Sequence, residues 1–197
     1  MGPSDEELVG AFQGGDLSAF DALVRRWNRR IQGAIHRFMG SEEDARDLCQ
    51  ETFLRAFRAL GAFKREARFS SWLYQIALNL CRDRMRRRRG RTLLSLEELE
   101  EGGEVPPIVP GPTAIEQLEA ADLSRAVADA VAALPEEQRE VIVLKEYEGL
   151  TFMEIAEVLG LPPSTVKTRL YRGLGQLRVR LERQGIRGGA PVPAPLP

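Results

Sequence analysis

The chain has 197 residues, of which 43% are hydrophobic and 29% are charged, so it can bury one medium core or two small ones. No apolar run approaches the roughly 18–20 residues needed to cross a bilayer, and the acidic N-terminus lacks the apolar segment of a signal peptide. Two cysteines and one histidine, at no ligand spacing, argue against a zinc site or a disulfide. We expect Cys49 and Cys81 to be buried thiols, His36 to lie at the surface or the core edge, and the protein to be cytoplasmic.

The net charge of −1 conceals an uneven distribution of charge along the chain. Residues 1–90 hold 17 Lys and Arg against 12 Asp and Glu, and residues 91–123 hold 1 against 8. Residues 124–197 are nearly balanced, with 10 against 9. A basic first part and an acidic middle predict local surfaces that contact a polyanion.

The first 60 residues predict two long helices. Apolar residues recur at helical spacing over residues 20–38, after Asp16 as the N-cap, and Gly40 ends that segment. A second helix begins at Ser41, and its apolar stripe runs over residues 45–60, opposite a charged face. Both patterns are typical of helices packed on one face against a core.

A basic segment and a third helix complete residues 1–90. Ser70 or Ser71 caps this helix, which ends in a run of arginines at positions 86–89. Aromatic rings beside a basic stripe suit single-stranded nucleic acid, because every base offers a face for stacking. The alternatives are that the arginines are a solvated helix end, that Trp72 belongs to the core, and that Phe69 is a hydrophobic staple. The cations and aromatics concerned are Lys64, Arg65, Arg68, Phe69, Trp72, Tyr74, Arg82 and Arg86.

Two segments break the helical pattern. Residues 91–112 combine glycines and prolines with a cluster of glutamates, which predicts a flexible acidic linker. Residues 188–197 alternate proline with small residues and are predicted to be a disordered tail.

The second domain, residues 113–187, is also predicted to be helical. Residues 113–116 form a capping box from which a helix runs to about Leu134. Pro135 suits the first turn of the next helix, which ends near Gly149. Since no strand candidate is found, the predicted fold class is all-α, with two helical domains joined by a flexible acidic linker and a helix-turn-helix at the end of the second.

Residues 151–177 carry that helix-turn-helix pattern. Ala156 is the small residue where two helices cross, Gly160 makes the turn, and Pro163 opens a second helix anchored by Val166. Ser and Thr near a helix N-terminus bind phosphate, and Lys and Arg bind phosphate or guanine edges. The alternative is an ordinary amphipathic helix pair with a basic, solvated face. The residues left to contact duplex DNA are Ser164, Thr165, Lys167, Thr168, Arg169 and Arg172.

Four motifs, in this order and spacing, resemble a bacterial sigma factor of the extracytoplasmic-function group. They are DARDLCQETF at residues 44–53, FSSWLYQIA at 69–77, LPEEQR at 134–139 with GLT at 149–151, and TVKTRL at 165–170. The resemblance covers about residues 5–183. It implies a stress-response transcription factor, not an enzyme, that binds the clamp helices and flap of RNA polymerase core, needs no cofactor, and directs promoter-specific initiation.

The resemblance also implies roles for particular residues. Residues 63–72 and the basic and aromatic side chains named above should recognise and melt the −10 element, with a flipped base held in the loop before Ser70. The helix after Pro163 should read the −35 element as duplex, and the linker should run towards the RNA exit path. An anti-sigma factor is implied as a further partner, without membrane insertion. The residues expected to bind polymerase core are Asp44, Asp47, Gln50, Glu51 and Arg55.

Promoter geometry constrains the linker. Two elements about 17 base pairs apart are separated by roughly 55–60 Å at ~3.4 Å per pair. A relaxed linker over residues 91–112 averages only about 25 Å, although its extended limit is ~70–80 Å. Polymerase must therefore hold the linker stretched, and we expect the free protein to bind promoter DNA weakly.

The sequence departs from the family pattern at two places, and two other functions are the alternatives to this interpretation. Pro162 occupies a position where the family often has a capping Ser or Thr, and the Pro-rich tail lies outside the pattern. A stand-alone regulator should show, in its first domain, a ligand pocket or an acidic phospho-acceptor site on a β/α pattern. A nuclease would use the acids at positions 42, 43, 44 and 47 for metal, but the dipole of a helix N-terminus explains them better.

Overall fold

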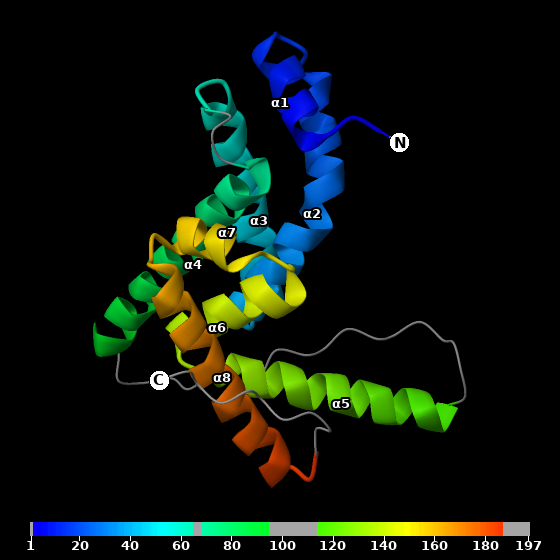
Figure 1. Ribbon diagram of the computed structural model, residues 1–197, viewed down its shortest axis with the longest axis vertical. Helices are drawn as coiled ribbons and strands as arrows, with labels where there is room; N and C mark the ends of the chain where they lie inside the picture. The colour runs from blue at the N-terminus through cyan, green and yellow to red at the C-terminus, as the bar shows by residue number, and fades with distance from the viewer. Residues whose placement is uncertain (1, 65–67, 95–113, 187–197) are drawn as a thin grey trace.

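The computed structural model describes residues 2–64, 68–94 and 114–186, together with the side chains of all of these except residues 91–94 and 114–122 (Figure 1). Over these ranges every regular element is a helix, which confirms the predicted fold class. No helix in the described ranges is both long and apolar enough to cross a membrane. Within the same ranges, no three His, Cys, Asp or Glu side chains are grouped to hold a metal ion.

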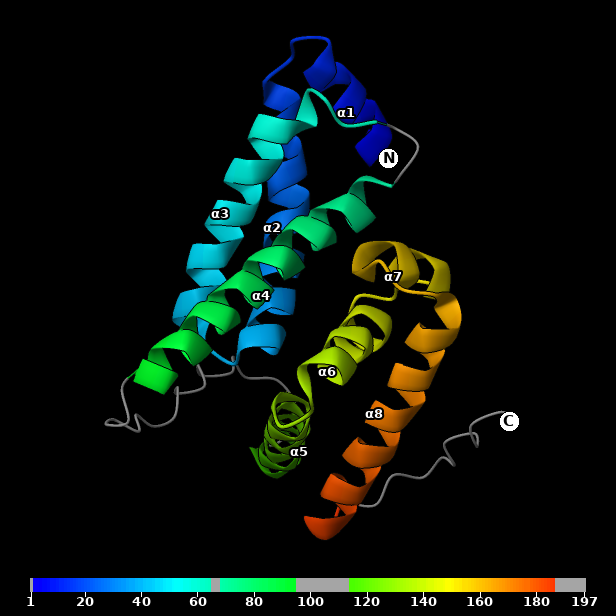
Figure 2. The ribbon, with the colours of Figure 1, turned by 90° about the vertical axis from the view of Figure 1, so that its left-hand side faces the viewer.

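The first helical unit consists of α1 (Asp5–Gln13), α2 (Ser18–Met39), α3 (Glu42–Leu60) and α4 (Phe69–Leu94). α2 and α3 lie alongside each other and α4 crosses them (Figure 2). The predicted apolar stripes of α2 and α3 are the faces that become buried. Among the described side chains, the largest ones that are fully buried in this unit include Phe38, Leu23, Ile31, Leu60 and Leu73.

The ends of these helices differ in part from the expectation. Asp16 does not occupy the N-cap position of α2, but its carboxylate accepts a hydrogen bond from the Ser18 amide at 2.9 Å. α1 is an additional helix, and its signal is the capping box in which Ser4 and Glu7 exchange hydrogen bonds. α4 continues through Gly90 to Leu94, into the segment predicted as linker. The rest of that segment and the tail at residues 188–197 lie outside the described residues.

The second helical unit consists of α5 (Ala114–Ala132), α6 (Glu136–Ile142), the π-helical turn η1 (Val143–Tyr147), α7 (Phe152–Leu159) and α8 (Pro163–Arg183). Together α6 and η1 fill the helix predicted from Pro135 to Gly149, and Gly149 adopts the left-handed conformation with φ of 71°. The capping box expected at residues 113–116 begins at Thr113, which lies outside the described residues.

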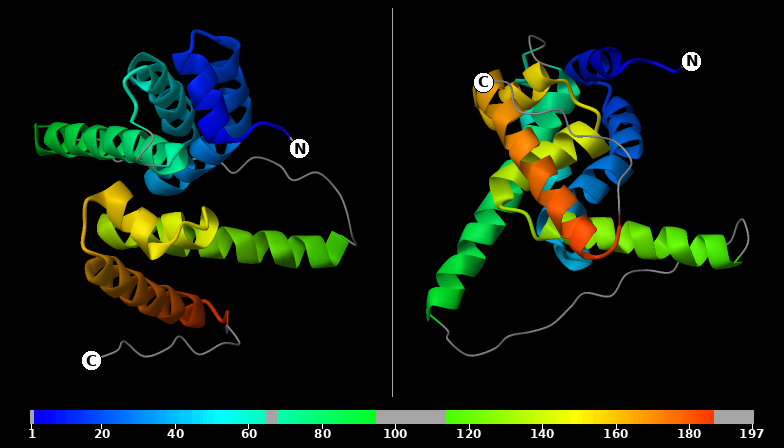
Figure 3. Two further views of the ribbon diagram at one scale, coloured as in Figure 1. Left: turned by 45° about the horizontal axis from the view of Figure 1, so that its top comes forward. Right: turned by 60° about the horizontal axis from the view of Figure 1, so that its bottom comes forward.

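The two units pack against each other. α4 lies against α7, and α2 contacts α5, α6 and η1. In the left view of Figure 3 the first unit lies above the second, while α5 projects from the body of the molecule. Arg82 and Arg89 of α4 pair with Glu140 and Glu136 of the second unit, whereas Arg84 and Arg88 pair with Asp44 of α3. α3 lies on the side of the first unit that is away from the second (Figure 2).

The three side chains considered for metal or disulfide chemistry lie where the sequence predicts. Cys49 and Cys81 are free and buried, and His36 is exposed. Burial raises the pKa of the Cys49 thiol to about 11. Burial, aided by the nearby carboxylates of Glu140 and Asp44, raises the pKa of the Cys81 thiol to about 12.

Candidate nucleic-acid interface

The helix-turn-helix is built from α7, a left-handed turn and α8. Thr151 and Glu154 close a capping box, with the Glu154 amide 3.2 Å from the Thr151 hydroxyl and the Thr151 amide 2.7 Å from the Glu154 carboxylate. Gly160 ends α7 with φ of 66°, a conformation that glycine adopts without a Cβ clash. Pro163 occupies the first turn of α8, and Pro162 supplies no side-chain cap, as the sequence indicates.

The buried side of α8 fixes which residues face outward. Val166 is 0% exposed and Leu170 is 4% exposed, and both pack towards α7 and α6. Ser164, Lys167 and Thr168 are exposed on the opposite side.

The remaining predicted donors of α8 lie in the same neighbourhood. Arg172 is exposed, Thr165 is half-buried, and the Arg169 guanidinium is 2.9 Å from the Glu137 carboxylate. A shallow groove of about 430 Å³ runs between the start of α6 and α8. Five of the six predicted donors line it, the exception being Lys167, whose ammonium lies 5.6 Å above the Phe152 ring.

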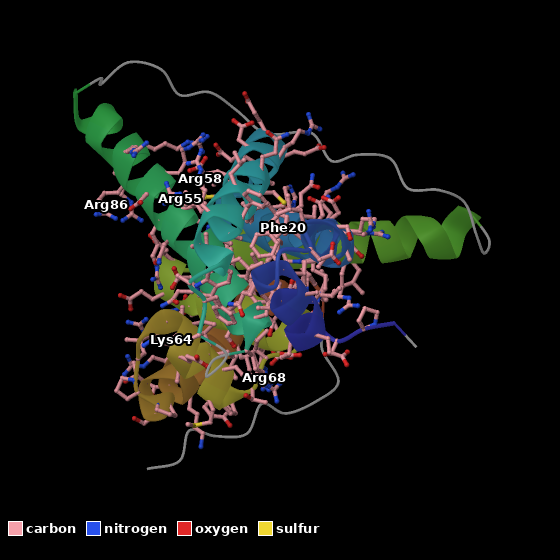
Figure 4. The ribbon with its side chains drawn as sticks, turned by 90° about the horizontal axis from the view of Figure 1, so that it is seen from above. Phe20, Arg55, Arg58, Lys64, Arg68 and Arg86 are labelled. Carbon is pink, nitrogen blue, oxygen red and sulfur yellow. The ribbon has the colours of Figure 1, made fainter. Side chains whose placement is uncertain are left out.

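Only some of the basic and aromatic residues predicted to contact the −10 element are exposed in the first unit. Lys64 and Arg68 are exposed near the start of α4, and Arg86 lies further along it (Figure 4). Trp72 is half-buried against Phe63, with ring centroids 4.8 Å apart. Arg65 and the next two residues of the loop before α4 lie outside the described residues. α4 begins at Phe69, so Ser70 and Ser71 lie inside the helix, and the prediction that one of them caps it is wrong.

Three of the residues predicted for single-stranded DNA are buried or already paired in this arrangement. Phe69 is 1% exposed and Tyr74 is 0% exposed, so neither ring presents a face for stacking. The reason is the register of α4, which turns both rings against Trp27. Arg82 instead makes two hydrogen bonds of 2.7 Å to the buried carboxylate of Glu140, and these raise the pKa of Arg82.

The acidic face of α3 needs one correction. Asp47 and Gln50 are exposed, and Glu51 forms an ion pair of 2.8 Å with Arg55 on the same face. Asp44, in contrast, is 2% exposed and points towards α4. Its carboxylate lies 2.7 Å from Arg84 and 2.6 Å from Arg88, so it joins two helices rather than presenting charge to a partner.

The outer face of α3 also carries two apolar side chains that the sequence reasoning passed over. Leu54 is 52% exposed and Phe57 is 43% exposed. Leu54 follows Gln50 by four residues, so it lies on the same side of the helix. The available signal was that both positions fall outside the buried stripe. Leu54 adds an apolar side chain to the predicted docking face, whereas the Phe57 ring also packs against Phe12 and Phe20, at 5.5 Å and 5.1 Å between ring centroids.

Comparison with known proteins identifies the chain. Residues 23–91 match the family model Sigma-70 region 2, and residues 124–177 match Sigma-70, region 4. The RNA polymerase sigma-H factor of Pseudomonas aeruginosa is 34% identical over 175 residues, which cover 85% of this chain and 89% of that protein. The ECF RNA polymerase sigma factor SigW of Bacillus subtilis is 34% identical over 170 residues, covering 85% and 91%. The chain belongs to the extracytoplasmic-function sigma factors.

Solved structures agree with this assignment. CnrH, in a structure with the cytosolic domain of CnrY, matches this sigma factor with a TM-score of 0.67 and 28% identity, covering 92% of this chain and 99% of that one. RpoE of Bartonella quintana, in complex with the anti-sigma factor NepR, has a TM-score of 0.72 at 21% identity and supports the fold alone. The predicted family, and with it a role in transcription initiation, is confirmed.

Proposed function

We propose that this sigma factor binds RNA polymerase core and directs it to promoters through two DNA contacts. The first domain, residues 1–90, would recognise and melt the −10 element, and the second, residues 113–187, would read the −35 element. Residues 91–112 would link them. The observation that carries the proposal is the outward face of α8, where Ser164, Lys167 and Thr168 are exposed on the second helix of the helix-turn-helix.

At the −35 element, α8 acts as the recognition helix in the major groove. The Ser164 hydroxyl and the Ser164 amide, at the start of α8, suit a phosphate, because a helix N-terminus favours anions. Lys167 and Arg172 project from the next turns and have the donors that guanine edges and phosphates accept. Arg169 would have to exchange its 2.9 Å ion pair with Glu137 for any contact with DNA.

Footprinting of the holoenzyme on a promoter tests this face of α8. Lys167→Ala and Arg172→Ala should each weaken promoter binding by about 10- to 100-fold, equivalent to ~1–3 kcal/mol, if they contact bases, and less if they contact phosphate alone. Arg178→Ala is the matched control, because Arg178 lies further along α8 and pairs with Glu182 at 2.8 Å. Wild-type affinity in both test variants would refute the groove assignment.

Polymerase core would dock on the outer face of α3. Asp47 and Gln50 supply exposed polar groups, and Leu54 and Phe57 supply the apolar area that stable protein interfaces bury. Asp44 is left out of this surface because α4 neutralises it. Arg55 is a peripheral member, since it already pairs with Glu51.

The −10 element would meet the start of α4, where Lys64, Arg68 and Trp72 combine cations with an aromatic edge. An anti-sigma factor is a further proposed partner, since CnrH was solved with the cytosolic domain of CnrY and RpoE was solved with the anti-sigma factor NepR. We place this activity in the cytoplasm and assign no catalysis to the chain.

A further inference from the structure

Four glutamates of the second unit face cations of the first. We call them the carboxylate row: Glu136 and Glu140 on α6, Glu148 after η1, and Glu154 on α7. The row follows the seam where α6, η1 and α7 approach α2 and α4 (Figure 2). Every member is paired with at least one arginine of the first unit.

The outer two members form ordinary ion pairs. Glu136 lies 2.8 Å from Arg89, and Glu154 lies 2.7 Å from Arg68. The side chains of both arginines are 72% exposed, so each pair contributes little by itself.

The inner two members are buried. The Glu140 side chain is 4% exposed and takes both hydrogen bonds from Arg82 in a bidentate pair. The Glu148 side chain is also 4% exposed, and it accepts the hydrogen bond of the Tyr74 hydroxyl. Arg30 and Arg37 of α2 lie 3.5 Å and 3.8 Å from the same carboxylate.

These partners determine whether the units stay together. A buried carboxylate is costly unless a cation or donor compensates it, and all the groups that compensate Glu140 and Glu148 belong to the first unit. When the units separate, both carboxylates return to water and need no partner. The ion pairs therefore favour the closed form, in which the two units are in contact, but allow the units to separate.

The carboxylate row also pairs with first-unit residues that are predicted to contact DNA. Arg68, Arg82 and Tyr74 are three of the candidate −10 contacts, and Glu154, Glu140 and Glu148 hold them. A carboxylate presents a guanidinium with the same pair of anionic oxygens as a phosphate. The second unit and a DNA strand cannot occupy these groups at the same time.

We infer that the second unit is an intramolecular competitor of the −10 strand, held over α4 by the carboxylate row until the units part. The inference rests on the proposed role of α4 in DNA binding. Closure leaves Asp47 on α3 and Lys167 on α8 exposed, so core docking and the −35 face are not blocked in the closed form. Opening is then a separate step that frees the Arg82 guanidinium from Glu140 and the Tyr74 hydroxyl from Glu148.

Distance measurements on the full chain test closure. Nitroxide labels at Asp21→Cys and Gln176→Cys, both exposed, report the separation of α2 and α8 by double electron–electron resonance, because the native thiols are buried. The wild-type chain should give one narrow distribution. Glu140→Gln with Glu148→Gln should add a longer, broad population. A distribution that is unchanged by these substitutions, or already broad in the wild type, would overturn the inference.

Two controls distinguish an effect of the substitutions on contact between the units from an effect of lost charge or of misfolding. Glu146→Gln with Glu157→Gln removes the same charge from exposed positions of the second unit and should keep the narrow wild-type distribution. Arg82→Glu alone should open the chain, and adding Glu140→Arg should close it again. An open chain after this swap would contradict the Arg82–Glu140 pair as part of the closure.

Binding of a fluorescein-labelled, mixed-sequence single-stranded 12-mer tests the competition. The Glu140→Gln, Glu148→Gln chain should bind at least about 10-fold more tightly than the wild type and than the charge-matched control. If the chain opens and its affinity does not rise, α4 is not a DNA surface, and the competition is refuted together with that part of the proposed function. If the chain fails to open, the closure is wrong, while the −10 proposal stands.

Discussion

Asp44 and Asp47 lie one turn apart on α3 and should respond in opposite ways to neutralisation. Asp44 is 2% exposed and is held by Arg84 at 2.7 Å and Arg88 at 2.6 Å. Breaking a fully buried ion pair costs about 3–5 kcal/mol. Here the two arginine side chains are 35% and 55% exposed. Water therefore compensates part of the charge of both arginines. The expected loss of free energy of unfolding in Asp44→Asn is then about 1–3 kcal/mol, as for hydrogen bonds to charged groups.

Urea unfolding followed by circular dichroism measures this difference. With a slope of ~1–3 kcal/mol per molar for small proteins, Asp44→Asn should lower the midpoint by roughly 1 M without changing the slope. Asp47→Asn should leave the free energy of unfolding within about 0.5 kcal/mol of the wild type, since its side chain is exposed.

Pull-down of polymerase core should give the opposite ranking. Asp47→Arg should reduce binding, and Asp44→Asn should retain it at temperatures where the variant is folded. Equal unfolding midpoints for the two Asn variants would refute the structural role of Asp44. Loss of core binding in folded Asp44→Asn would return Asp44 to the docking surface.

Two further predictions concern packing. A Cβ on Gly173 would lie 2.6 Å from the Ile142 side chain, whereas a Cβ on Gly175 would meet nothing within 4 Å. The Gly173→Ala variant should therefore be less stable than Gly175→Ala by about 1–3 kcal/mol. Equal urea midpoints for the two variants would contradict this. Burial raises the pKa of Cys49 to about 11 and that of Cys81 to about 12, so at pH 8 about one thiol in a thousand or fewer is ionised. Both should resist iodoacetamide in the native chain and react in urea; rapid native labelling of either would show that it is not buried.

The sequence predicts most of the fold because local signals agree with tertiary packing. The stripe of α3 has the period of a helix buried on one side, and Gly160 marks a turn that requires the left-handed conformation. For the same reason, the caps of α7 at Thr151 and Gly160 and the start of α8 at Pro163 are predicted to the residue, although α8 continues to Arg183. α1 was missed because its one signal, the Ser4–Glu7 capping box, precedes only a short helix.

The site is harder to predict because it depends on how helices cross. Asp44 and Asp47 look alike as acids in the first turns of α3, and only the approach of Arg84 distinguishes them. Tyr74 lies beside an arginine run in the sequence, yet the crossing of α4 over α2 turns its ring inward. Glu148 has the sequence context of a solvated acid, and its partners lie more than 70 residues away along the chain.

Transcription by purified polymerase core, with and without this chain, tests the central claim most directly. The templates are a library of genomic fragments, and the products are mapped by their 5′ ends. The account predicts discrete start sites that appear only with the chain and that weaken together in the Lys167→Ala and Arg172→Ala variants. Absence of any start site that depends on the chain would contradict it.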